Sequence, residues 1–321
     1  MARTLKPTPM PDALDVLTVG EAMALFIAQQ PGPLDQVSSF TRVTAGAELN
    51  VAVGLARLGF SVAYLSRLGD DSYGRHLRRF MAAEGIATHL VATDAAHPTG
   101  TMLKTLAIDG SDPDIEYFRR GSAASHLGLV DLPVDLLRRT RHLHLTGITP
   151  ALSGGTRALV FEMARAARSA DCSISFDPNL RPRLWASPAE MRDVLNELAT
   201  HCDWVLPGLA EGRLLTGADT PEGIADFYLR RGASKVVVKL GPLGAFYASP
   251  QERGAAAGWP VERVVDTVGA GDAFAVGVIS ALLEGQTLAA AASRGNQLGA
   301  RAVGFPGDCD GLPTRAQLQA S

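Results

Sequence analysis

The stretch Asp266-Thr-Val-Gly-Ala-Gly-Asp-Ala-Phe-Ala-Val-Gly-Val-Ile-Ser-Ala-Leu-Leu-Glu284 decides the fold of this chain. The β-branched residues at 261–265 predict a strand that ends at Asp266. Small and apolar residues at helical spacing predict a helix from Ala273 that stops before Gly285. The glycine-rich turn between them lets a ligand approach the backbone closely, and the first N–H groups of the helix attract anions. We therefore expect an anion site at this turn.

Asp272 lies at the mouth of the predicted anion site. A carboxylate beside bound phosphate can position and deprotonate an attacking hydroxyl, as kinase chemistry requires. An aspartate at a helix start is also a common N-cap, so the pattern alone leaves both roles open. A dinucleotide fingerprint is excluded because Phe274 stands where its third small residue belongs, and a P-loop is excluded because the chain has no Gly-Lys pair.

Two separated segments resemble the signatures of one family. Asp266 to Asp272 is similar to the C-terminal signature of the PfkB (ribokinase-like) carbohydrate kinases, Asp-Thr-x-Gly-Ala-Gly-Asp. Residues 45–52 (Ala-Gly-Ala-Glu-Leu-Asn-Val-Ala), followed by Leu-Ala-Arg-Leu-Gly at 55–59, resemble the N-terminal glycine signature. Two signatures in the right order are more specific than either alone, and the resemblance runs from about Val16 to Gly311. It implies an ATP-dependent kinase with Asp272 as the catalytic base.

Composition excludes several classes of protein. The 321 residues are 46% hydrophobic and 20% charged, with a net charge of −3 and a pI near 6.2, so no overall field favours nucleic acid or anionic membranes. Three cysteines at wide spacing fit neither a disulfide framework nor a zinc site, which suggests a cytoplasmic protein. The charge-free run at 273–283 is shorter than the roughly 20 residues that a membrane span needs. Residues 1–14 lack the apolar core of a signal peptide, and we expect a disordered tail there.

The order of predicted elements indicates an α/β fold. Strands alternate with helices of ten or more residues, which is typical of a parallel sheet covered by helices on both faces. The segments 21–43 and 99–120 break the alternation because their extended stretches have no helix between them. The resemblance implies one kinase domain over 15–321, a ribokinase-like three-layer sandwich whose mainly parallel central sheet carries a small β-sheet lid at these segments. The lid could also form a homo-oligomer contact. The expected helices are 47–58, 73–84, 156–169, 188–200, 211–215 and 221–231, and the expected strands are 16–19, 62–66, 142–145, 173–176, 204–206 and 235–239; 255–258 is expected to be a turn.

Two further motifs point to the substrate. Tyr117-Phe-Arg-Arg-Gly-Ser-Ala-Ala-Ser125 and Asp177-Pro-Asn-Leu-Arg-Pro-Arg-Leu-Trp185 resemble segments of the 2-keto-3-deoxygluconate kinases, one branch of the family. That sugar carries a carboxylate, and the fork of an arginine guanidinium matches a carboxylate. Paired arginines on an edge strand are also common as solvated charges, so that alternative stays open. The resemblance implies that the sugar acid is bound by Gly46, Tyr117, Arg119, Arg181, Asp272 and Asp308, although an Asp-x-Asp-Gly turn explains Asp308 nearly as well.

The resemblance also implies a nucleotide site and a metal. Residues 239–244 match the family's glycine-bearing ATP loop; they also fit a tight β-turn, and both can be true together. The expected ATP-binding residues are Asn179, Arg181, Lys239, Gly241, Gly244, Thr267, Gly269, Ala270, Gly271 and Asn296. Many relatives hold Mg²⁺ through water with Asn-x-x-Glu, whereas this chain has Gly208-Leu-Ala-Glu211 and keeps only the acid. Asp266 lies where relatives with a monovalent-cation site place a ligand, but the sequence establishes no such site.

Three hypotheses follow from the sequence. The first is an ATP- and Mg²⁺-dependent kinase for the 6-hydroxyl of 2-keto-3-deoxygluconate. The second is the same chemistry on a neutral sugar such as fructose or ribose. The third is a non-catalytic sugar-sensing relative, which the altered Asn-x-x-Glu motif favours and the intact Asp272 disfavours.

Overall fold

The fold is built around one large sheet. The computed structural model describes residues 13–106 and 113–320. Within these ranges nine strands form a sheet in the order β13-β12-β11-β10-β9-β8-β1-β4-β5. Neighbouring strands from β11 to β5 are parallel, whereas β12 and β13 are antiparallel additions at one edge. Its strands are β1 (Leu14–Val19), β4 (Val62–Gly69), β5 (Val91–Asp94), β8 (Thr140–Thr146), β9 (Ser173–Asp177), β10 (Trp204–Val205), β11 (Lys235–Lys239), β12 (Gly244–Ala248) and β13 (Arg253–Ala257).

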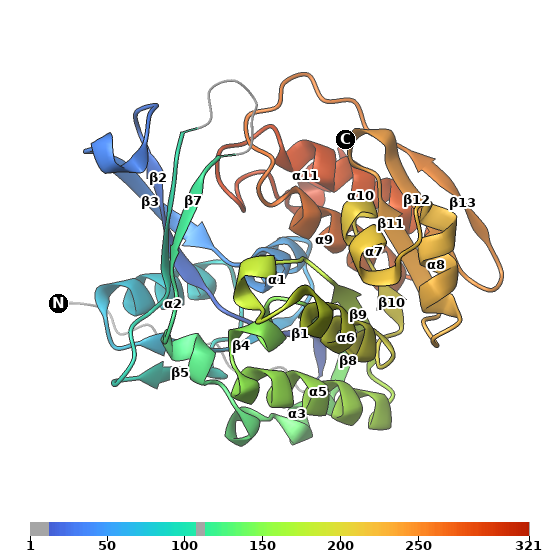
Figure 1. Ribbon diagram of the computed structural model, residues 1–321, viewed down its shortest axis with the longest axis horizontal. Coiled ribbons are helices and arrows are strands. Elements are labelled where there is room, and N and C mark those ends of the chain that lie inside the picture. Colours follow the sequence, from blue (N-terminus) through green and yellow to red (C-terminus); the bar gives the residue numbers. More distant parts are fainter. Residues whose placement is uncertain (1–12, 107–112, 321) are drawn as a thin grey trace.

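Helices cover both faces of this sheet (Figure 1). One face is covered by α1 (Ala47–Arg57), α2 (Ser72–Ala83), α9 (Ala270–Leu283) and α10 (Leu288–Ala302). The other face is covered by α3 (Val134–Leu137), α5 (Gly154–Ser169), α6 (Pro188–Ala199), α7 (Leu209–Thr216) and α8 (Pro221–Leu229). Two short helices, α4 (Thr149–Leu152) and α11 (Arg315–Gln319), complete the set. The predicted three-layer sandwich is confirmed, and each predicted helix is present with its ends shifted by a few residues.

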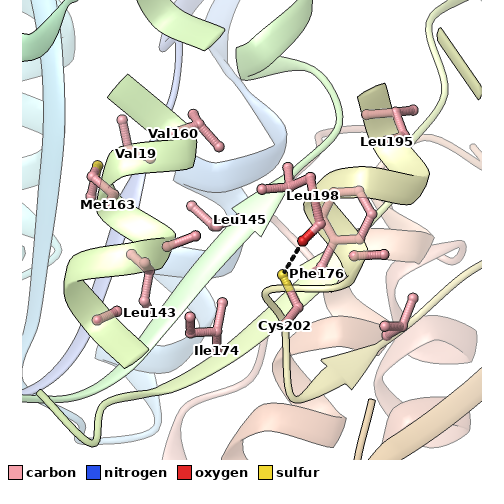
Figure 2. Packing of buried hydrophobic residues seen from close by; sticks show 14 of the residues in the cluster. Val19, Leu143, Leu145, Val160, Met163, Ile174, Phe176, Leu195, Leu198 and Cys202 are labelled. Carbon is pink, nitrogen blue, oxygen red and sulfur yellow. Dashed lines mark hydrogen bonds between the residues drawn. The ribbon is translucent and has the colours of Figure 1, made fainter. Parts of the chain in front are cut away.

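The core forms because the central strands bury side chains on both faces. In β1, Val16 packs into the cluster under α1 and α9, while Leu17 packs into the cluster under α5. Figure 2 shows the second cluster, in which Val160 and Met163 of α5 lie over the β8 residues Leu143 and Leu145. The sequences of such strands are nearly continuous runs of apolar residues, as is typical of parallel sheets covered on both faces. Burial of these side chains is the main force that holds the helices on the sheet.

A second, smaller sheet lies beside the first and forms the lid. Its strands are β2 (Met23–Ala28), β3 (Phe40–Ala45), β6 (Thr101–Lys104) and β7 (Ile115–Phe118), in the order β3-β2-β6-β7. These strands run from blue to green on the left of Figure 1. The predicted lid segments 21–43 and 99–120 are therefore confirmed as a separate sheet, although residues 107–112 of the second segment lie outside the described ranges.

Three local predictions are wrong. Residues 261–265 form no strand: Val261 and Val264 are exposed, and the amide of Val265 bonds to Val303 O outside any sheet. Residues 255–258, expected to be a turn, mostly belong to β13, whose small side chains suit a close antiparallel pairing with β12. The expected tail at 1–14 ends too late, because the buried Leu14 begins β1; the prediction for residues 1–12 lies outside the described ranges.

Candidate active site

A cavity of about 410 Å³ lies between the lid and the carboxyl ends of the large sheet. Ligands of α/β proteins bind at such strand ends. The lid contributes Met23, Met102 and Tyr117, and the sheet contributes Lys239 where β11 ends. Twelve of the sixteen predicted site residues line it: Gly46, Tyr117, Arg119, Asn179, Arg181, Glu211, Lys239, Thr267, Gly269, Gly271, Asp272 and Asp308. The structure thus brings most of the predicted site together.

Asp272 projects from the first turn of α9 into this cavity and is 8% exposed. Asn50 Nδ2 donates a hydrogen bond of 2.7 Å to its Oδ2, and Asn179 Nδ2 donates one of 3.2 Å to its Oδ1. Burial raises the pKa of Asp272 to about 7; the Asn50 hydrogen bond opposes this rise and the Asp177 charge adds to it. A carboxylate with this pKa is suited to accept a proton near neutral pH.

Helix α9 begins three residues earlier than predicted, at Ala270, so Asp272 is not the N-cap. The N-cap is Gly269, whose φ of +83° is strained for any other residue. A Cβ at Gly269 would also lie 2.7 Å from the carbonyl oxygen of Asp308. The glycine is therefore needed for both reasons. Because the first N–H groups of a helix have no intrahelical partner, the start of α9 presents donors toward the cavity.

Lys239 brings positive charge to the same end of the cavity. Its Nζ lies 2.6 Å from Asp177 Oδ2 at the end of β9. Burial by itself lowers the pKa of Lys239, but the Asp177 and Glu211 carboxylates outweigh it and hold the pKa above its usual range. Burial raises the pKa of Asp177 to about 6, against the attraction of Lys239. Lys239 therefore stays charged and can meet the phosphate groups of a nucleotide.

Arg119 is not a solvated edge charge, as one sequence interpretation held. It is 8% exposed, and its Nη2 and Nε lie 2.5 and 2.7 Å from Glu21 Oε2. Glu21 is itself buried, and its Oε1 accepts a hydrogen bond from Ser122 Oγ. The guanidinium also lies 5.6 Å from the centre of the Tyr117 ring. The arginine is thus held rigidly at the cavity wall, with a partner that the sequence did not reveal.

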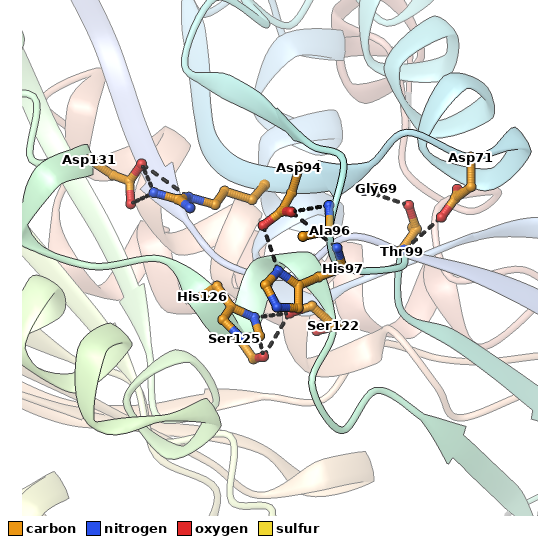
Figure 3. A network of polar contacts seen from close by, with 11 residues as sticks. Gly69, Asp71, Asp94, Ala96, His97, Thr99, Ser122, Ser125, His126 and Asp131 are labelled. Carbon is orange, nitrogen blue, oxygen red and sulfur yellow. Dashed lines mark hydrogen bonds and ion pairs between the residues drawn. The ribbon is translucent and has the colours of Figure 1, made fainter.

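A polar network around Ser122, the residue that donates to Glu21, fixes the neighbouring segments (Figure 3). The Ser122 carbonyl contacts His126 Nδ1 at 3.0 Å, and the His126 ring stacks on His97 at 3.5 Å. Thr99 follows His97 by two residues. Its hydroxyl accepts a hydrogen bond from the Gly69 amide, and its own amide donates one to the Asp71 carboxylate. The ring stack joins the segment before β6 to the 3-10 turn after β7, and the Thr99 bonds join the same segment to the end of β4 and the start of α2. They hold Ser122, and through it Glu21, in place.

Arg181 and Asp308 complete the predicted substrate residues in the cavity. Arg181 Nη1 donates to Leu180 O at 3.0 Å, which leaves the rest of its guanidinium at the cavity surface. Asp308 Oδ1 has no hydrogen-bond partner among the described residues, and it lies 3.6 Å from Lys104 Nζ. Burial raises the pKa of Asp308, and the Lys104 charge opposes this rise.

Glu211 caps α7. Its carboxylate accepts the amides of Gly208 (2.7 Å) and Leu180 (2.8 Å) while it lines the cavity. No group of three or more His, Cys, Asp or Glu suited to a metal occurs in the ranges 13–106 and 113–320. Mg²⁺ commonly keeps several waters and takes few protein ligands. The residues present therefore fit a water-mediated Mg²⁺ site better than a closed cage.

Four predicted nucleotide residues do not line the cavity: Gly241, Gly244, Ala270 and Asn296. Gly241 and Gly244 have φ of +60° and +101° at the start of the single 3-10 turn that joins β11 to β12 and at the first residue of β12, and this tight connection is compatible with an ATP role as well. Asn296 Nδ2 donates to the carbonyls of Ala256 and Ala257, which ties α10 to β13. Their roles toward ATP stay predictions.

Sequence reasoning missed several residues of the site. Asn50 and Asp177 stand inside motifs that were recognised, yet neither was singled out. Glu21 and Lys104 carry no local signal, because their partners lie 98 and 162 positions away in the chain. The only available hint was a single charged residue, Lys104 at the end of β6 and Glu21 just before β2.

The sequence pattern of the pfkB family of carbohydrate kinases matches residues 13–315. The chain belongs to this family. A 2-dehydro-3-deoxygluconokinase from Bacillus subtilis is 48% identical over 95% of this chain and 94% of its own length. The crystal structure of a PfkB protein from Polaromonas sp. JS666 is 53% identical, with a TM-score of 0.89 over 96% of this chain and 100% of its own. A provisionally assigned ribokinase II from E. coli, solved with ATP and Mg²⁺, is 27% identical with a TM-score of 0.88 over 96% and 98% of the two chains.

The pfkB assignment confirms the ribokinase-like fold and makes the chain a carbohydrate kinase. Within the described ranges, no helix is long and apolar enough to span a bilayer. The three cysteines are free and buried.

Proposed function

We propose that this kinase transfers the γ-phosphoryl group of ATP to the 6-hydroxyl of 2-keto-3-deoxygluconate. The observation that carries the proposal is Arg181, which lines the same cavity as Asp272 and donates only to main-chain carbonyls among the described residues. Arg119 lines the cavity too but already has Glu21 as its anionic partner, so Arg181 is the guanidinium that gains such a partner from a sugar acid and none from a neutral sugar. The 48% identity with the B. subtilis 2-dehydro-3-deoxygluconokinase supports the same substrate.

The residues of the cavity fit this reaction. Asp272 takes the proton of the 6-hydroxyl as its oxygen bonds to the γ-phosphorus and the bond to the leaving ADP oxygen breaks. Asn50 and Asn179 hold the carboxylate in position through its two oxygens. The start of α9 and Lys239 stabilise the negative charge of the transferred group. Most of the rate enhancement then comes from positioning and electrostatics.

Glu211 is proposed to hold Mg²⁺ through water. Two backbone amides fix its carboxylate at the cavity wall. The carboxylate is therefore held in place although the chain lacks the asparagine of the Asn-x-x-Glu motif. Bound Mg²⁺ neutralises phosphate charge and orients the phosphoryl group. The complex of the E. coli relative with ATP and Mg²⁺ supports the use of this ion.

The test is ADP release with a panel of 2-keto-3-deoxygluconate, gluconate, fructose and ribose. We expect kcat/KM for the keto acid to exceed that for fructose by about 100-fold or more, because a neutral sugar leaves the Arg181 guanidinium without an anionic partner. Phosphorus NMR of the product should show a 6-phosphate ester. Fructose as the better substrate would establish the neutral-sugar kinase instead, and no transfer to any of the four would support the sugar-sensing alternative.

The predicted homo-oligomer through the lid stays a prediction. Phe118 at the end of the lid edge strand β7 is 57% exposed. Light scattering of the purified chain measures the oligomeric state directly.

A further inference from the structure

Lys104 is a buried cation that the phosphoryl-transfer mechanism does not use. It ends the lid strand β6 and is 1% exposed. The chain contains four lysines in all. Since a buried ammonium is costly unless oxygen atoms surround it, its partners indicate what it does.

The partners of Lys104 are all oxygen atoms, and they come from two loops next to the active site. Its Nζ lies 2.5 Å from Asp266 Oδ2, 3.4 Å from Pro306 O and 3.6 Å from Asp308 Oδ1. Asp266 opens the turn that leads into α9, and Asp308 lies in the loop after α10. One lid side chain therefore joins the lid to both loops.

This oxygen set is also what a free monovalent cation would require. Hard cations bind carboxylate and carbonyl oxygens, and an ammonium group offers the same single positive charge. The resemblance placed Asp266 at a cation-ligand position. The residues present do not fit a free cation there, because the Lys104 ammonium already lies against Asp266.

We propose that the Lys104 ammonium takes the place of a monovalent cation beside the phosphate-binding turn, so that this kinase needs no added K⁺. Asp266 Oδ1 accepts the Val268 amide at 3.0 Å, and this bond shapes the turn that ends at Gly269. Lys104 neutralises the other oxygen of Asp266, which would otherwise repel both Asp308 and an incoming phosphate. Lys104 is thus a positioning residue for the start of α9.

The first test uses the unmodified protein, exchanged into tetramethylammonium chloride and then titrated with KCl at constant ionic strength. We expect kcat/KM and the midpoint of thermal unfolding to stay unchanged. A K⁺ stimulation of about tenfold or more would overturn the proposal. The rate measurement rests on the proposed substrate, whereas the thermal unfolding measurement needs no substrate. Failure of the substrate assignment can therefore be distinguished from failure of this inference.

The second test compares Lys104→Ala and Lys104→Met with Lys235→Met, a control at a partly exposed lysine that packs over the Trp204 ring. In tetramethylammonium chloride we expect both Lys104 variants to lose roughly tenfold or more in kcat/KM. For Lys104→Ala, KCl or NH₄Cl should restore part of the rate and raise the unfolding midpoint, because the emptied oxygen set then binds a free cation. Neither salt should affect Lys235→Met. A folded Lys104→Ala variant that responds to neither salt would overturn the proposal; if it does not fold, the first test decides.

Discussion

The side-chain amide of Asn50 donates a 2.7 Å hydrogen bond to Asp272 across 222 positions of sequence. Asn50 lies in α1 and Asp272 in α9, so the bond joins the two glycine-bearing signatures. The thiol of Cys309 lies 3.1 Å from Asn50 Oδ1 and donates to it, which turns the amide NH₂ group toward the aspartate. A carboxylate held in this way meets the substrate in one orientation.

Asn50→Ala should shift the pH dependence of the reaction. The Asn50 hydrogen bond holds down the pKa of Asp272, which burial raises to about 7. Without it that pKa rises further, so we expect the acid limb of kcat/KM to move up by about one pH unit. Steady-state rates from pH 5.5 to 9 measure the shift. Cys309→Ser, which keeps a donor to Asn50, should leave the limb in place; an unmoved limb in Asn50→Ala would contradict this role.

Asp272→Asn should lower kcat by about 10³-fold or more while the fold stays intact. It should also change stability in a pH-dependent way. The folded-state pKa of Asp272 lies above its unfolded value, so the folded state binds more protons between about pH 4 and 7, and the stability of the unmodified protein falls as pH rises through this range. Asparagine does not titrate. We therefore expect the variant to gain stability relative to the parent from pH 5 to pH 8 in urea unfolding, and near-normal turnover would refute the catalytic role.

Arg119→Met should destabilise the protein strongly, because it leaves the buried Glu21 carboxylate without its cation. Breaking a buried ion pair in this way costs about 3–5 kcal/mol. The double variant Glu21→Gln/Arg119→Met removes both charges and keeps an acceptor for Ser122, so its stability should recover. Urea unfolding compares the three proteins, and both variants should remain poor kinases for the sugar acid. A double variant no more stable than the single one would show that the pair is not the cause.

Asn296→Ala should reduce stability by about 1–3 kcal/mol, because two carbonyls of β13 lose their donor. If its role is confined to this contact, KM for ATP should change little. Thermal unfolding and ATP titration of the same sample separate the two effects. A large rise in KM without loss of stability would favour the ATP-binding role that the resemblance implies.

The sandwich could be predicted because its helices and parallel strands carry plain apolar patterns. The errors arose where the residue types suggest one structure and the packing of the fold gives another. Val261 and Val264 are β-branched, which favours a strand, but they are exposed and pair with no neighbouring strand. In β13 the run of alanine and glycine resembles a turn, although its backbone pairs with β12 over five residues.

The site was predictable only as far as its motifs reach. The turn at 269–271 and Asp272 were found because the chemistry and the local backbone share one short segment. Glu21 and Lys104 were not, because the role of a single charged residue is seen only when the fold brings its partner to it. Arg119 was found for its charge, yet its ion pair depends on Glu21, which lies in the loop between β1 and β2, 98 positions away.

Helices α9 and α10 come last in the large-sheet core, and this order has a consequence for biosynthesis. A ribosome that has reached β13 has already made all nine strands of the large sheet, but neither the anion-binding turn nor Asp272. A chain that stops there lacks Asp272 and therefore cannot transfer phosphate from ATP. It also leaves bare the apolar face that α9 and α10 cover, which is the kind of surface that chaperones and proteases recognise. Synthesis of α9 and α10 therefore both supplies Asp272 and covers the apolar face.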